Sequence, residues 1–380
     1  MRAAVAVDEG LDPGRAMEQA GDAALANLGG PAALAIAFVS TAHGCSAALR
    51  QASVPGLAGA GVCVAVHVEG VISDAGERAA MPAVAVLALG GAGVRFDLHS
   101  FDHARGREDE LGDELVATFA DLGCDDLVLV VADAHELDPR SLAAGLSRCA
   151  PACVLGVGVE GPAGGPAAHA IDGEVSEGGA LAIRLRAPSA LRCALAPATS
   201  LCGTRTVTST RGNWIVELDG ASALEEFRDA AGALWDDERR AMRSVLVALP
   251  ELPGAEPEPA LVRGVVGIDP EQGAIALAEP VEVGQRLAFA RRDALAAREA
   301  LAAAGESLAP LSEGGGIGLA SSCRARGEAL FGHAGIESGY LARAFRPAPW
   351  LGLIGSYQIA GTRRATSSLL THTAALVRLV

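Results

Sequence analysis

The first half of the chain alternates continuous apolar runs with segments whose apolar residues repeat at helical spacing. The uninterrupted runs have the length of buried strands and cover residues 34–39, 62–68, 82–89, 127–132 and 154–159. In residues 11–28 and 139–149 the apolar side chains instead recur three or four positions apart, as on the buried face of a helix. Strands and helices that alternate in this way predict a layered α/β domain.

After Pro166 the pattern changes, and strand-like segments follow one another more closely. Arg211-Gly212 lies between two such segments and is a hairpin signal. The strands predicted in this region cover residues 180–186, 205–210, 213–218, 262–268, 274–278 and 286–291. Ser222 and Glu225 have the spacing of a helix start, and a second helix is predicted over residues 236–247.

These patterns predict an α/β fold with some α+β character, in two domains that each contain a mixed β-sheet and flanking helices. Residues 1–30 are expected to form a helical lead-in, residues 31–218 the N-terminal domain and residues 219–380 the C-terminal domain. The boundary is placed at Asp219-Gly220, where a strand passes directly into a helix.

Polar residues concentrate at the ends of two glycine-bearing apolar segments near the C-terminus. Residues 317–323 and 350–355 read as strands, with a helix over residues 336–345 between them. The first strand leads into Cys323-Arg324-Ala325-Arg326-Gly327, and the second leads into Ser356-Tyr357-Gln358. Because ligands of α/β proteins usually bind at strand ends, we expect a binding site here.

Composition narrows the range of partners and cofactors. The formal net charge of −16 disfavours nucleic acid and anionic membranes as partners. Most of the eight cysteines lie beside apolar residues and none forms a Cys-x-x-Cys pair, which favours free thiols in a reducing compartment over zinc or disulfides. No signal-peptide pattern precedes the first domain, so a cytoplasmic location is expected. No glycine loop has phosphate- or dinucleotide-binding spacing, so no cofactor is predicted. No cluster of His or carboxylate residues has metal-ligand spacing, so no metal is predicted either.

The C-terminal region resembles the C-terminal half of FIST-domain proteins, a family of small-ligand sensors in prokaryotic signalling. The resemblance rests on Ser322-Cys323-Arg324-Ala325-Arg326-Gly327, on Leu330-Phe331-Gly332 and on the segment 349–355. Where the family has Gly-Glu-Ile, this chain has Tyr357-Gln358-Ile359, which replaces a carboxylate with an amide. In the N-terminal half, only Glu69-Gly70 survives of the family's Gly-Cys-Ser/Thr-Ala-Glu-Gly strand end.

The strand-end argument and the resemblance together define a candidate ligand site without catalytic residues. It comprises Cys323, Arg326, Gly327, Glu337, Gly355, Tyr357, Gln358, His372, Thr373, Glu69 and Gly70. Arg326 is expected either to bind an anionic group of the ligand or to pair with Glu328 or Glu337. Cys323 is either a reactive thiol beside arginines or a small buried residue. Cys323 and His372 lack a recognisable third member of a catalytic triad.

The resemblance therefore implies a non-catalytic sensor that binds a small metabolite, with amino acids as the proposed ligand class, and that signals through a protein partner. Two alternatives remain open. The first is an enzyme that uses Cys323, and the second is an interaction scaffold without a ligand.

Overall fold

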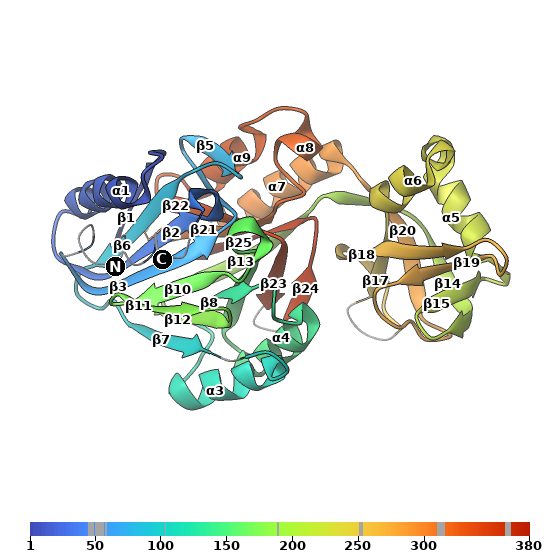
Figure 1. The fold of residues 1–380 in the computed structure, drawn as a ribbon, viewed down its shortest axis with the longest axis horizontal. Helices are drawn as coiled ribbons and strands as arrows, with labels where there is room; N and C mark the ends of the chain where they lie inside the picture. Colours follow the sequence, from blue (N-terminus) through green and yellow to red (C-terminus); the bar gives the residue numbers. More distant parts are fainter. Residues whose placement is uncertain are drawn as a thin grey trace. The chain divides into compact units, whose positions relative to one another are not determined.

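The computed structural model describes residues 1–44, 49, 57, 59–102, 104–187, 190–250, 254–309, 316–361 and 366–380. The chain divides into two compact units (Figure 1). Unit 1 contains residues Met1–Ala196, Leu301–Leu369 and Thr373–Val380, and unit 2 contains Pro197–Ala300 and Leu370–His372. Among the described residues, no helix combines the length and the apolar character needed to cross a membrane.

Unit 1 is built from three mixed sheets, each of six strands. The first sheet runs in the order β1 (Arg2–Asp8), β6 (Val84–Gly90), β2 (Ala32–Ser40), β3 (Ala60–Val68), β10 (Ala168–Ile171) and β11 (Glu174–Glu177). The second runs β7 (Phe96–Phe101), β12 (Ala180–Arg186), β8 (Asp126–Asp133), β9 (Cys153–Val159), β23 (Tyr357–Gly361) and β24 (Ser368–Leu370). The third runs β13 (Leu191–Pro197), β25 (Thr373–Leu379), β21 (Ile317–Cys323), β22 (Trp350–Gly355), β4 (Gly70–Ser73) and β5 (Gly76–Ala79).

The same topology occurs three times. The centre of each sheet is a parallel pair, β2 with β3, β8 with β9, or β21 with β22, and an antiparallel strand lies on either side of it. The two strands that follow each parallel pair in the chain cross to another sheet, so β4–β5 joins the third sheet, β10–β11 the first and β23–β24 the second. Residues 2–90, residues 96–186, and residues 191–197 together with 317–379 are therefore three structural repeats, and most of unit 2 is inserted into the third. The sequence shows no extended internal repeat that corresponds to them.

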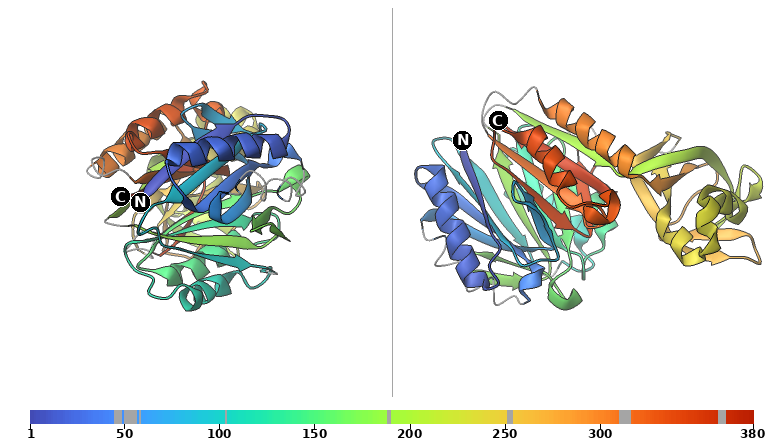
Figure 2. Two further views of the ribbon diagram at one scale, coloured as in Figure 1. Left: turned by 90° about the vertical axis from the view of Figure 1, so that its left-hand side faces the viewer. Right: turned by 90° about the horizontal axis from the view of Figure 1, so that it is seen from above.

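One apolar core lies between the three sheets, and helices cover their outer faces. The core includes Ile36, Val66, Leu129, Leu319 and Leu353, which lie on inward-facing positions of all three sheets. Helix α1 (Pro13–Leu28) packs on the first sheet, α3 (Leu111–Thr118) and α4 (Pro139–Leu146) on the second, and α9 (Ile336–Phe345) on the third. Figure 2 shows these helices around the outside of the strands.

Unit 2 is a small closed barrel. Its strands are β14 (Thr199–Arg211), β20 (Arg286–Arg292), β17 (Val245–Pro250), β18 (Pro257–Asp269), β19 (Ala274–Leu277) and β15 (Trp214–Leu218), and β15 pairs back to β14. The predicted hairpin at Arg211-Gly212 is confirmed, with Arg211 opposite Trp214. Ser222 accepts a hydrogen bond from the Glu225 amide and begins α5 (Ala223–Ala231), as predicted.

The mixed α/β class is confirmed, but the compact units do not follow the predicted boundaries at 30/31 and 218/219. Residues 1–30 are not a separate lead-in, because β1 pairs with β6 and α1 packs on the first sheet. The barrel begins at Pro197, before the predicted boundary, and the chain after Leu301 returns to complete the sheets of unit 1. The hydrophobic pattern of the sequence could not predict this return of the chain, because the pattern of a strand does not reveal which sheet the strand joins.

Two glycines in helices provide a test of the packing in unit 1. A Cβ atom on Gly112 would lie 1.8 Å from the Gly145 carbonyl oxygen, where α3 meets α4, whereas one on Gly339 would have no neighbour within 4 Å. We expect Gly112→Ala to lower the free energy of unfolding by about 1–3 kcal/mol because it overpacks this contact. Gly339→Ala in α9 should raise it by about 0.5–1 kcal/mol, because alanine favours a helix interior. Urea unfolding measures both, and equal effects would contradict the helix contact.

Candidate functional site

The carboxyl ends of the three central parallel pairs meet in unit 1. The last paired residues in the three sheets are Ser40 with Val68, Asp133 with Val159, and Cys323 with Gly355. The residue that follows the second strand of each pair is therefore structurally equivalent in the three repeats. These residues are Glu69, Glu160 and Ser356.

Together with Arg324, which follows β21, these three residues form what we call the strand-end cluster. The Arg324 guanidinium donates to both carboxylate oxygens of Glu160, at 2.8 and 3.1 Å, and lies 3.4 Å from Glu69 Oε2. Glu69 Oε1 accepts hydrogen bonds from Ser356 Oγ at 2.5 Å and from the Glu160 amide at 3.1 Å. Each of the three repeats thus contributes at least one side chain to a single polar network.

The ion pair between Arg324 and Glu160 forms the solvent-exposed side of the cluster. The side chains of Arg324 and Glu160 are 50% and 43% exposed, whereas that of Glu69 is only 11% exposed. Hydrogen bonding from Arg324 holds the pKa of the Glu160 carboxyl below its ordinary value, against the opposing effect of burial. Hydrogen bonding to Glu160 likewise raises the pKa of Arg324. Both groups are therefore charged at neutral pH, and the outer pair screens the more buried Glu69 from solvent.

Several predicted site residues lie directly beside this cluster. Cys323 is 4% exposed, and its sulfur is 3.8 Å from the Ser356 carbonyl oxygen that accepts its hydrogen bond. A Cβ atom on Gly355 would lie 2.3 Å from the Gly158 carbonyl oxygen, and one on Gly70 would lie 2.3 Å from the Arg78 carbonyl oxygen. Both positions therefore require glycine, because other chain segments approach closely there.

Arg326, Glu337 and Gly327 lie elsewhere. Arg326 Nε donates to Glu337 Oε1 at 2.8 Å, and its Nη1 donates to the Ala196 carbonyl at 2.9 Å. Ser322 Oγ also donates to Glu337, so the buried pair connects β21 to α9. Gly327 has a φ of 63° and precedes the short helix α8 (Glu328–Phe331). Of the two expectations for Arg326, the structure contains the ion pair with Glu337.

Tyr357 and Gln358 point to opposite faces of β23. The Tyr357 ring covers Gly158 and belongs to the apolar layer under α4, where burial raises the pKa of its hydroxyl. Gln358 is fully buried, and its Nε2 donates to the Gly355 carbonyl over 3.4 Å. Tyr357 is only 7% exposed and Gln358 is fully buried, so direct ligand contact by Gln358 would require the sheet to open.

His372 and Thr373 are neighbours in sequence but belong to different units. His372 lies in unit 2, where its carbonyl accepts a hydrogen bond from the Ala198 amide at 2.9 Å. Thr373 is fully buried at the start of β25 in unit 1. The hydrogen bonds that define the strand-end cluster come from other residues.

The sequence analysis missed Glu160 and preferred Arg326 to Arg324. A signal for Glu160 was present, because Val68-Glu69-Gly70 is repeated as Val159-Glu160-Gly161, each time at the end of a predicted apolar strand. Among the described residues, no group of three or more His, Cys, Asp or Glu side chains is arranged to hold a metal ion. All described cysteines are free.

Two family models match this chain, one for each half. The model of the FIST N domain matches residues 33–221, and that of the FIST C domain matches residues 223–356. The chain belongs to the FIST-domain family. The two models meet within two residues of Ala221, close to the predicted boundary, although the compact units of this FIST protein divide elsewhere.

Two mycobacterial relatives show how far this similarity extends. The uncharacterized protein Rv0628c of Mycobacterium tuberculosis is 34% identical over 131 residues, which is 33% of this chain and 34% of the relative. The uncharacterized protein Mb0898c of Mycobacterium bovis is 28% identical over 158 residues, which is 40% of this chain and 41% of the relative. The matched region of this FIST protein thus spans about a third to two fifths of these curated relatives.

Proposed function

We propose that this FIST-domain protein is a cytoplasmic sensor that binds a small metabolite at the strand-end cluster and passes the signal to a protein partner. FIST domains are associated with sensory roles in signal transduction. The observation that carries the proposal is the convergence of three repeats on one partly exposed network of opposite charges. Such a network can exchange its internal pairs for pairs with a ligand.

Free amino acids are the ligand class that fits this exchange. Arg324 presents a planar fork that can bind a carboxylate through two hydrogen bonds. Glu69 and Glu160 present carboxylates to an ammonium group, and Ser356 Oγ adds a polar contact. The predicted roles of Arg326 and Gln358 in ligand contact are less well supported, because both side chains are buried beneath other elements.

A cysteine-dependent enzyme is the less favoured alternative. The Cys323 sulfur is buried, and its hydrogen-bond partner is a main-chain carbonyl and not a basic side chain. A thiolate nucleophile usually has a partly exposed, electropositive environment. Turnover of any amino acid derivative that is lost in Cys323→Ser would favour the enzyme.

Thermal unfolding in the presence of single amino acids tests the sensor. A ligand at about a hundred times its Kd stabilises the native state by about 2.7 kcal/mol, which raises Tm by several degrees. We expect Arg324→Ala to remove this shift without changing the unliganded Tm by more than about 2 °C, because a half-exposed pair contributes little stability. Arg107→Ala is the matched control, since Arg107 forms a similarly exposed pair with Glu110 and Glu114. A shift that survives in Arg324→Ala, or no shift with any amino acid, would contradict the proposal.

A further inference from the structure

The charges of the strand-end cluster do not balance. Glu69 and Glu160 contribute two carboxylates, and Arg324 contributes one guanidinium. The two short hydrogen bonds of that guanidinium both go to Glu160, at 2.8 and 3.1 Å, and its contact with Glu69 is 3.4 Å long. The two carboxylates therefore share one guanidinium, and Glu69 has the longer of the two ion pairs.

The longer ion pair belongs to the more buried of the two carboxylates. Glu69 Oε1 accepts two hydrogen bonds, but Oε2 receives only the long contact from Arg324. With a side chain 11% exposed, Glu69 has lost most of its hydration. A largely buried carboxylate interacts more strongly with an added positive charge than an exposed carboxylate does.

Among the described residues, the hydrogen bonds and ion pairs of Glu69 include no cation besides Arg324. His135 is exposed and also helps to lower the pKa of Glu160, but Arg324 has the larger effect on that pKa. The whole chain carries a formal charge of −16, so the surrounding field also attracts cations.

We infer that the ligand of this site carries a net positive charge, as a basic amino acid does. This rests on the proposed function, which places an amino acid at the strand-end cluster. A neutral zwitterion brings one charge of each sign and leaves the cluster with its excess of one carboxylate. A ligand with a second ammonium or guanidinium group neutralises the cluster, with its carboxylate on Arg324 and its two cationic groups on Glu69 and Glu160.

Isothermal titration calorimetry with three probes tests this inference. L-lysine and L-norleucine share an α-amino acid group and an unbranched side chain, but only lysine has the terminal ammonium. Cadaverine has both amines of lysine but no carboxylate. We expect lysine to bind at least tenfold more tightly than either of the other two, and its advantage over norleucine to shrink at high salt. Norleucine binding as tightly as lysine would overturn the positive charge, and cadaverine binding as tightly would overturn the carboxylate contact.

Variants separate this inference from the proposed function. Glu69→Gln keeps the shape of the side chain but removes one of the two carboxylates. It should reduce lysine binding more than tenfold and leave lysine with less than a threefold advantage over norleucine. Glu114→Gln in the surface pair of α3 should change neither. If norleucine binds and its binding requires Arg324, the site is correct and only the charge is wrong. If none of the three probes binds and no amino acid raises Tm, both proposals fail.

Discussion

Arg326→Ala should lower the free energy of unfolding by about 3–5 kcal/mol, whereas Arg324→Ala should lower it by less than about 1 kcal/mol. The two arginines are two positions apart, but the side chains of Arg326 and Glu337 are each only 1% exposed, and that of Arg324 is 50% exposed. Without Arg326, the Glu337 carboxylate stays buried but loses its guanidinium partner. It keeps the hydrogen bond from Ser322 Oγ, and the Glu77 carboxylate lies nearby because it accepts a hydrogen bond from the Glu337 amide. An uncompensated buried charge is among the most destabilising defects known in proteins.

Urea unfolding of the two variants beside the wild type measures this difference. The double variant Arg326→Met with Glu337→Met should recover much of the loss, because it removes both charges and fills a similar volume. In ligand titrations the order reverses, and Arg324→Ala should be the variant that no longer binds. An Arg326→Ala protein that is as stable as the wild type but does not bind ligand would mean that Arg326 contacts the ligand and is not a structural residue.

The sequence was sufficient to predict the strands and the helix around Cys323, because each is a continuous apolar or periodic segment. Residues 317–323, 336–345 and 350–355 all form the predicted elements. What could not be predicted was the direction of the two arginines. Arg324 and Arg326 lie in a turn, where side-chain direction does not follow the regular alternation of a strand.

The predicted helix over residues 236–247 shows a second limit of local pattern. Helix α6 (Glu238–Ser244) ends at Ser244, and the apolar residues that follow form β17 between β18 and β20. A short apolar run can serve either structure, and here two strands distant in sequence decide between them. The crossing of β4–β5, β10–β11 and β23–β24 between sheets escaped prediction for the same reason, and with it the meeting of Glu69, Glu160 and Ser356.

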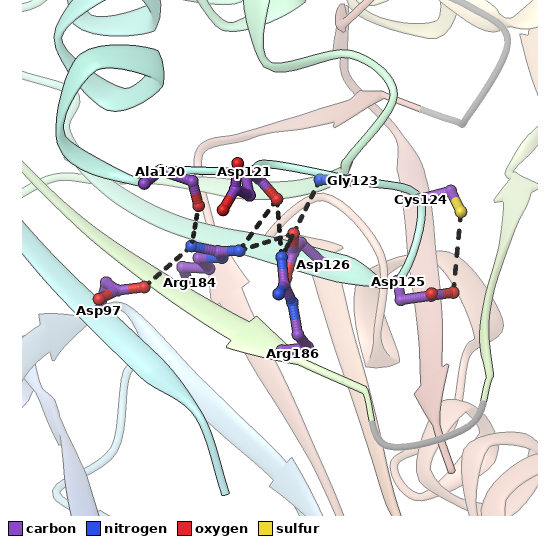
Figure 3. Close-up of polar contacts among 9 residues, drawn as sticks. All are labelled: Asp97, Ala120, Asp121, Gly123, Cys124, Asp125, Asp126, Arg184 and Arg186. Carbon is purple, nitrogen blue, oxygen red and sulfur yellow. Dashed lines mark hydrogen bonds and ion pairs between the residues drawn. The ribbon is translucent and has the colours of Figure 1, made fainter.

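Besides the buried pair of Arg326 and Glu337, a second buried ion-pair network lies around Asp126, at the start of β8 (Figure 3). The Asp126 carboxylate accepts hydrogen bonds from Arg184 Nη2 at 3.0 Å, from Arg186 Nε and Nη2 at 2.8 and 2.9 Å, and from the Gly123 amide at 2.8 Å. The two arginines also donate to the main-chain carbonyls of Ala120 and Asp121. This fully buried carboxylate thus holds the loop after α3 against β12.

Asp126→Asn should therefore lower the free energy of unfolding at pH 7 by about 3–5 kcal/mol, because the isosteric amide removes the carboxylate that both guanidinium groups share. Of the described residues, only the half-exposed Asp97 would still pair with Arg184, at 3.1 Å. Burial by itself would raise the pKa of Asp126, but the hydrogen bonds from Arg186, Arg184 and Gly123 outweigh it and lower the pKa. A carboxyl with a lowered folded-state pKa stabilises the protein above its unfolded pKa of about 3.9, and this stabilisation is lost as the pH falls through the folded-state value.

The difference in stability between wild type and Asp126→Asn should thus stay constant from pH 7 to about pH 5 and shrink at lower pH. Urea unfolding at pH 7, 5, 4 and 3 measures it, with Asp113→Asn as the control for an exposed aspartate paired with an arginine. Asp113→Asn should change stability by less than about 1 kcal/mol at every pH. A difference for Asp126→Asn that grows as the pH falls would mean that the folded-state pKa is raised, and that burial outweighs the arginines.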